Sequence, residues 1–136
     1  MLMKDSCTVI SMDVGLTHLT AALKSVEMLA NTNKGAYVCV ANVHMCMEVF
    51  DSTAFKAIVN DADLVIPDGR PLSWAQKLLG HKGAQQVRGQ DIMTSVCEHS
   101  ASKNLNIGLY GGSSDELLKQ VVAKLKLSFP DINITF

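Results

Sequence analysis

Three short polar or glycine-rich segments each follow an apolar run, and their groups could bind a ligand. Asn42 and His44 follow the run 36–41, Asp68 and Gly69 follow 64–67, and Gly111, Gly112 and Ser113 follow 106–110. If these runs are parallel strands, their carboxyl ends open onto one edge of a sheet, where open α/β sheets bind ligands. The three segments are therefore candidate ligand contacts in one cleft.

Asp68 is the candidate for acid/base chemistry. It follows Pro67 at the end of an apolar strand, and a carboxylate held there can accept a proton from a substrate hydroxyl. Aspartate in this position also forms Asx turns, and Pro71 marks a helix start that Asp68 could cap. The residues alone leave the catalytic and the structural role open.

The segment from Gly111 to Ser113 would let backbone N–H groups and the next helix N-terminus approach a phosphate. An ordinary tight turn between strand and helix is the alternative. Residues 108–112 do not match the dinucleotide fingerprint GxGxxG, and they follow a late strand. This disfavours a nicotinamide or flavin enzyme.

Arg88 and Asp91 offer a cation suited to a diphosphate beside an acid that can cap the next helix. A surface ion pair plus a cap is the alternative. Asn42 has the spacing of a helix cap, which we favour over substrate contact from spacing alone. A lone histidine at a helix start, such as His44, is more often a cap or a packed polar residue than an acid/base.

Asp61 and Asp63 form a DxD pattern, which many glycosyltransferases use to hold a metal. They precede the strand 64–67, which puts them at the amino end of the sheet, so we interpret them as solvated loop charges. The other histidines have no metal-ligand spacing. The sequence therefore predicts no metal site.

The elements that position these residues alternate between helix and strand patterns. We expect strands over 36–41, 64–67, 106–110 and 132–136. We expect helical residues over 16–30, capped by Thr17, and over 45–59, broken near Asp51 and Ser52. Further helices are expected from Pro71 to Leu79, capped by Gly80, from Asp91 to about 103, and after a cap formed by Ser113 with Glu116. Leu72, Ala75, Leu78 and Leu79 form the apolar face of the helix from Pro71 to Leu79, and Met45, Met47 and Trp74 are expected in the core.

This alternation predicts a Rossmann-like α/β fold, a parallel sheet flanked by helices on both faces, in a single domain over residues 1–136. No helix follows the last strand, so one face of the sheet would lack its cover. We expect that the domain continues past Phe136, or that a partner, such as a second copy in a homo-oligomer, supplies the cover.

The composition of the chain argues against several classes of function. The chain has 136 residues, 48% of them hydrophobic, with a formal net charge of -1 and no run of Lys or Arg, which makes nucleic acid a poor partner. The four cysteines form no CxxC pair, which fits a reducing cytoplasm. No window has the roughly 20 apolar residues of a membrane span, so we expect a soluble or peripherally bound protein.

Four segments together resemble the WecG/TagA/CpsF family, glycosyltransferase family 26. They are residues 40–45 (VANVHM), 60–69 (NDADLVIPDG), 87–91 (VRGQD) and 108–112 (GLYGG), in the family's order. The likeness covers nearly the whole chain, and the family's domain continues beyond Phe136. The resemblance therefore implies that the C-terminal part of that domain is missing here.

The resemblance implies an inverting transfer of an N-acetylmannosamine-type sugar or a hexose. The donor would be a UDP-sugar and the acceptor a polyprenyl-diphosphate-linked sugar, in surface polysaccharide, exopolysaccharide or teichoic acid synthesis. Neither a metal nor another cofactor is implied. The full-length protein would work in the cytoplasm, peripherally associated with the inner face of the cell membrane.

Carried over onto this chain, the family's proposed base falls on Asp68, the Asn of its TxN segment on Asn42, and its Gly-Gly turn near the nucleotide on Gly111 and Gly112. Two positions depart from the family: its usual Thr is Val40, and its frequent Glu is His44, a form that resembles an exopolysaccharide-linked subgroup. A non-catalytic nucleotide-binding or assembly fragment is the alternative function. A dehydrogenase or methyltransferase is the third, but the chain lacks the glycine fingerprint of such enzymes.

Overall fold

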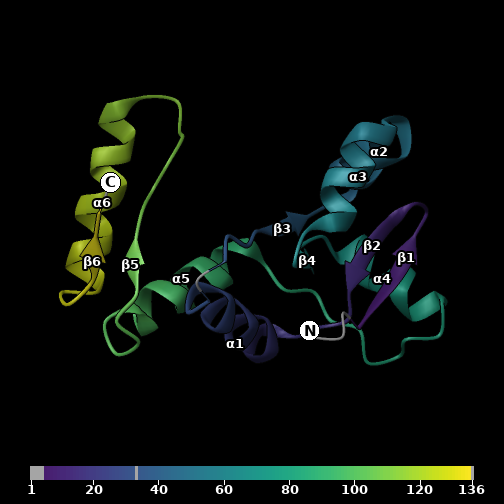
Figure 1. Ribbon diagram of the computed structural model, residues 1–136, viewed down its shortest axis with the longest axis horizontal. Helices are drawn as coiled ribbons and strands as arrows, with labels where there is room; N and C mark the ends of the chain where they lie inside the picture. The colour runs from purple at the N-terminus through teal and green to yellow at the C-terminus, as the bar shows by residue number, and fades with distance from the viewer. Residues whose placement is uncertain (1–4, 33, 136) are drawn as a thin grey trace. The chain divides into compact units, whose positions relative to one another are not determined.

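The computed structural model describes residues 5–32 and 34–135, which form two compact units, Met1–Ile92 and Met93–Phe136 (Figure 1). The first unit contains β1 (Ser6–Val9), β2 (Met12–Gly15), α1 (Leu19–Ala30), β3 (Val38–Ala41), α2 (Val43–Asp51), α3 (Thr53–Asp61), β4 (Leu64–Pro67) and α4 (Arg70–Leu78). Helix α5 (Gly89–Ser100) spans the division, and the second unit continues with β5 (Asn106–Ile107), α6 (Asp115–Ser128) and β6 (Asn133–Ile134).

The predicted α/β class and its parallel strand pairing are confirmed. β3 pairs with β4 in parallel, with α2 and α3 as the crossover between them, and β5 pairs with β6 in parallel through α6. Within the described residues the strands pair two by two. β5 and β6 are shorter than the predicted strands 106–110 and 132–136, since residues 108–110, Ile132 and Thr135 fall outside the strands; Phe136 lies outside the described residues.

The hairpin of β1 and β2 was not expected from the sequence. Its strands pair antiparallel, with Val9 opposite Met12, and Ile10 in the turn has a positive φ of 59°. β-branched residues rarely adopt this conformation, and no glycine or Asn-Gly pair marks the turn. The composition of the segment therefore carried no hairpin signal.

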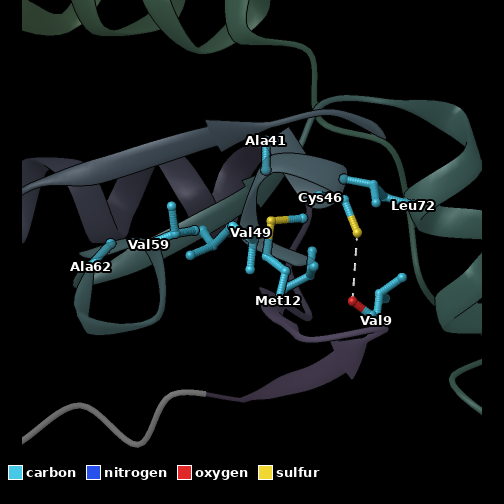
Figure 2. Close-up of a cluster of buried hydrophobic side chains, with 10 residues drawn as sticks. Val9, Met12, Ala41, Cys46, Val49, Val59, Ala62 and Leu72 are labelled. Atoms are coloured by element: carbon cyan, nitrogen blue, oxygen red, sulfur yellow. Dashed lines mark hydrogen bonds between the residues drawn. The ribbon is translucent and has the colours of Figure 1, made fainter. Parts of the chain in front are cut away.

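The hairpin supplies three of the ten buried residues in the core cluster of the first unit (Figure 2). The buried side chains come from the hairpin, β3, β4 and the helices α2, α3 and α4: Val9, Met12, Val14, Ala41, Cys46, Val49, Val59, Ala62, Val65 and Leu72. The Cys46 thiol donates to the carbonyl oxygen of Val9 at 3.6 Å, as the dashed line in Figure 2 shows. Burial raises the pKa of this thiol, so it packs as a small neutral group.

Helix α4 turns a polar side chain inward and apolar side chains outward. Gln76 is fully buried, and its Nε2 donates to the carbonyl oxygens of Val14 (3.3 Å) and Gly15 (3.0 Å) at the end of β2. The predicted apolar face is therefore wrong in part, because Leu78 and Leu79 lie outside. The expected core position of Trp74 is wrong for the same reason.

The two methionines of α2 divide between core and surface. Met45 packs against the buried cluster, as expected, whereas Met47 is 42% exposed and its predicted core position is wrong. The reason is helical spacing, since Cys46 and Val49 occupy the buried side of this short helix.

Three predicted helix boundaries are confirmed. Asn42 caps α2, with its Oδ1 accepting from the N–H of Met45 at 3.0 Å. Ser52 ends α2 and caps α3, at the expected break. Gly80, just past α4, has a φ of +103°, the left-handed conformation that favours glycine at this position.

Three other predicted caps are wrong. His18, not Thr17, caps α1, because His18 is extended and its Nδ1 accepts from the N–H of Ala21. Likewise Ser114 rather than Ser113 caps α6. Asp91 lies inside the first turn of α5, which already begins at Gly89.

Among the described residues, no helix is both long enough and apolar enough to cross a lipid bilayer.

Gly15 lies where the hairpin closely approaches β4, and a substitution there tests this contact. A Cβ at this position would lie 2.8 Å from the carbonyl oxygen of Val65, a backbone atom that cannot move aside. We expect Gly15→Ala to lower the free energy of unfolding by about 1–3 kcal/mol, the usual cost of overpacking. Urea denaturation measures it. Gly83→Ala is the control, because nothing lies within 4 Å of its Cβ position; equal stability of the two variants would contradict the close approach.

Candidate functional site

Asn42 and Asp68 lie side by side at the carboxyl ends of β3 and β4. The register pairs Ala41 with Pro67, and the N–H of Asp68 donates to the carbonyl oxygen of Ala41 at 2.9 Å. A Cβ at Gly69 would lie 3.6 Å from the Cα of Asn42, in ordinary van der Waals contact. The structure thus brings together Asn42, Asp68 and Gly69 as the sequence predicted.

The carboxylate of Asp68 is not used by the local fold. Helix α4 is capped by Gly69 and has no side-chain cap bond, so the capping role that the sequence left open for Asp68 is not adopted. Its backbone carbonyl accepts a short hydrogen bond from Nε2 of Gln86. Within residues 5–32 and 34–135 no hydrogen bond reaches the carboxylate, which is half-buried and free to meet a substrate.

The loop before α5 closes over the end of β4. The N–H of Val87 donates to the carbonyl oxygen of Pro67 at 2.8 Å, beside the Gln86 bond. Gly89 follows, where a Cβ would lie 2.9 Å from Cγ1 of Val40 and 3.6 Å from Oδ2 of Asp68. Sequence reasoning missed Gln86 and Gly89 as site residues; the only available signal was the position of Gly89 beside Arg88.

Arg88, in this loop, forms an exposed ion pair with Asp91 in the first turn of α5. Nε and Nη2 of Arg88 each lie 2.9 Å from one carboxylate oxygen of Asp91. The hydrogen bond to Asp91 and the charge of Asp91 raise the pKa of the Arg88 guanidinium, and the charge of Asp68 raises it further. Burial acts in the opposite direction and lowers this pKa. Since a guanidinium carries five N–H donors and this pair uses two, the others can bind a second anion.

His44 stands apart from this geometry. Its side chain is 81% exposed on the first turn of α2, and its Nε2 lies 3.6 Å from Oε1 of Glu48 one turn along the helix. The position leaves the imidazole open to a ligand, away from the Asp68 carboxylate at the end of β4.

The glycine turn after β5 belongs to the second compact unit. Gly111 and Gly112 both have positive φ (97° and 105°), which glycine adopts without strain. The turn and Ser113 line a pocket of about 800 Å³. Asp115 and Glu116 occupy the first turn of α6, where they already interact with the helix dipole and would oppose a phosphate.

The DxD residues lie at the amino end of β4, as predicted. Asp63 Oδ2 accepts from the N–H of Tyr37 at 3.0 Å. A cavity of about 490 Å³ opens at this end, and the charged residues that line it are all aspartates: Asp5, Asp13, Asp61 and Asp63. Their charge would repel a diphosphate, so the carboxyl end of the sheet is the better place for one.

Comparison with known proteins identifies the family of the chain. Residues 7–136 match the profile described as the glycosyl transferase WecG/TagA/CpsF family. Two similar relatives are both called N-acetylglucosaminyldiphosphoundecaprenol N-acetyl-beta-D-mannosaminyltransferase. The one from Bacillus spizizenii strain W23 is 26% identical over 122 residues, which are 90% of this chain and 46% of the relative.

The second relative, from Bacillus subtilis strain 168, is 22% identical over 100 residues, which are 74% of this chain and 39% of the relative. This chain thus spans less than half the length of either relative. The family profile, in contrast, extends over nearly every residue, including the strand ends that carry Asn42 and Asp68. The chain belongs to the WecG/TagA/CpsF family of glycosyl transferases.

Proposed function

We propose that the chain carries the acceptor-activating part of an inverting glycosyltransferase, with Asp68 as the general base. The observation that carries the proposal is the free carboxylate of Asp68 at a strand end, beside Asn42 and within electrostatic reach of Arg88. A carboxylate bound by its own backbone or by a helix end would be a poor base, and Asp68 is in neither situation.

In the proposed step, a hydroxyl oxygen of the acceptor sugar attacks the anomeric carbon of the donor. Asp68 accepts the hydroxyl proton as the new glycosidic bond forms. The bond between the anomeric carbon and the diphosphate oxygen breaks, and UDP leaves with the electron pair. Attack from the side opposite the leaving group inverts the anomeric carbon, and fixed positive groups stabilise the departing charge.

Arg88 is the proposed ligand of the departing diphosphate. It is exposed, retains N–H donors beyond its pair with Asp91, and belongs to the loop that covers the end of β4. Asn42 and Gly69 border the carboxylate and would contact substrate, as would His44 at the start of α2. Gly111, Gly112 and Ser113 are proposed to contribute backbone groups to the nucleotide, but the carboxylates of α6 make them weaker phosphate ligands than Arg88.

The names of the relatives support an N-acetylmannosamine-type sugar as the group transferred and a lipid-diphosphate-linked N-acetylglucosamine as the acceptor. We propose a UDP-sugar as the donor, with no metal or other cofactor, and a hexose as the alternative sugar. Such an acceptor is held in a membrane, so we propose peripheral association with the cytoplasmic face. The pathway would be synthesis of a surface polysaccharide, exopolysaccharide or teichoic acid.

A non-catalytic nucleotide-binding or assembly role is the alternative. One observation favours it: Val40 carries no hydroxyl at the edge of the site. This role predicts calorimetric binding of UDP without turnover, even when the remaining length of a full family member is supplied.

Asp68→Asn tests the proposed base. The amide cannot accept the hydroxyl proton, so we expect turnover to fall by about 10²- to 10⁴-fold. The free energy of unfolding should stay unchanged, because no described residue donates to the carboxylate. The measurement is UDP release from a UDP-sugar with a lipid-diphosphate-linked N-acetylglucosamine. Asp61→Asn, at the opposite end of the sheet, is the control and should keep full activity; unchanged turnover in Asp68→Asn removes Asp68 from the mechanism.

Asn42→Asp separates capping from substrate contact. The carboxylate keeps the cap acceptor for the N–H of Met45, so the free energy of unfolding should hold, whereas Asn42→Ala should lose about 1 kcal/mol. The new charge beside Asp68 and the lost amide donor should raise the KM for the UDP-sugar. Thermal unfolding and initial rates measure the two effects. Full activity in Asn42→Asp would show that Asn42 is only a cap.

A further inference from the structure

The outward face of α4 combines apolar and basic side chains. Trp74 is 58% exposed and Leu78, one turn further, is 89% exposed. Arg70 lies one turn before Trp74, and Lys77 lies beside both on the same face, opposite the buried Leu72, Ser73 and Gln76. We call Arg70, Trp74, Lys77 and Leu78 the α4 surface.

The charge around this surface is of one sign. Residues 69–90 include Arg70, Lys77, Lys82 and Arg88 and not one Asp or Glu, although the whole chain has a formal net charge of -1. Arg88 is paired with Asp91, whereas Arg70, Lys77 and Lys82 form no ion pair within the described residues. The segment that follows Asp68 is thus a local positive region in a slightly acidic chain.

We propose that the α4 surface docks on a lipid bilayer that contains anionic headgroups. Tryptophan favours the boundary between headgroups and acyl chains, and basic side chains extend from an apolar base toward anionic headgroups. Trp and Arg are also enriched at protein interfaces, whereas lysine is depleted there; the basic side chains of residues 69–90, with no acidic residue among them, favour anionic lipid.

The docking inference extends the proposed function, which requires a lipid-linked acceptor. Helix α4 begins two residues after Asp68, and Gly69 is its N-cap. A bilayer in contact with the outer face of α4 would hold a lipid-diphosphate substrate near the carboxyl end of β4. Vesicle binding itself needs neither acceptor nor turnover, so the two proposals can fail separately.

A second exposed apolar pair provides a matched comparison on another face. Phe50 of α2 is 61% exposed and Ile58 of α3 is 58% exposed. Glu48, Asp51 and Asp61 lie on the same two helices, against Lys56 as their one lysine or arginine. Anionic lipid would be repelled there, so exposure alone does not predict docking.

The experiment uses the fluorescence of Trp74, the single tryptophan of the chain. The full chain is titrated with vesicles of phosphatidylcholine alone and of equimolar phosphatidylcholine and phosphatidylglycerol. Docking predicts a blue shift of the emission and quenching by brominated lipid, only with the anionic vesicles. In co-sedimentation, Lys77→Gln should weaken binding about five-fold, the loss expected for one basic residue at an anionic surface. Trp74→Ser and Leu78→Ser should weaken it further.

Phe50→Ser and Lys56→Gln are the controls and should bind as the unchanged chain does, with circular dichroism verifying that every variant is folded. Asp68→Asn should also bind fully, which separates docking from catalysis. Three results would each overturn the inference: no binding to anionic vesicles, equal loss in the controls, or binding without quenching of Trp74. A lipid-free change of oligomeric state in Trp74→Ser would instead identify the α4 surface as a protein interface.

Discussion

The parallel pairing of β3 with β4 fixes the position of the residues at the centre of the proposed site. Ala41 and Pro67 are both fully buried and lie opposite each other, so the chain leaves the sheet at Asn42 and Asp68 in the same place. A register slip of one residue would separate Asp68 from Asn42 and would move the buried side chains of the slipped strand out of their packing positions. Core packing therefore sets the spacing between the Asn42 amide and the Asp68 carboxylate, the two groups that we propose contact the substrate.

The hairpin of β1 and β2 determines which face of α4 is buried. Its last carbonyl groups lie at Val14 and Gly15, and Gln76 satisfies both. Buried carbonyl groups without a donor are costly, so a polar side chain points inward at this position of the helix. Trp74 and Leu78 face outward as a consequence, and the apolar part of the α4 surface arises from hydrogen bonding elsewhere in the core.

The sequence predicted those features that depend on neighbouring residues and missed those that depend on distant ones. The bounds of β4 were predicted correctly, because an apolar run interrupted by Pro67, Asp68 and Gly69 needs no distant partner to be recognised. The inward turn of Gln76 depends on carbonyl groups more than 60 positions away, as the separations of 61 and 62 residues show. Helical periodicity, which counts Leu78 and Leu79 as core, contains no such information. Gln86 was missed for the same reason, since its partner is the backbone of Asp68 across a loop.

The predictions for the site also differ according to whether they depend on neighbouring or on distant residues. The adjacency of Asn42 and Asp68 followed from parallel-sheet geometry, whereas the pairing of Arg88 with Asp91 was an alternative that their spacing left open. The convergence of Gly111 and Gly112 with Asp68 stays a prediction, because that turn belongs to the other compact unit. Val40 and Gly89 share one volume beside the carboxylate. The constraint runs in one direction: threonine has the shape of valine and can replace Val40 with Gly89 unchanged, whereas a side chain at position 89 would require a smaller residue at position 40.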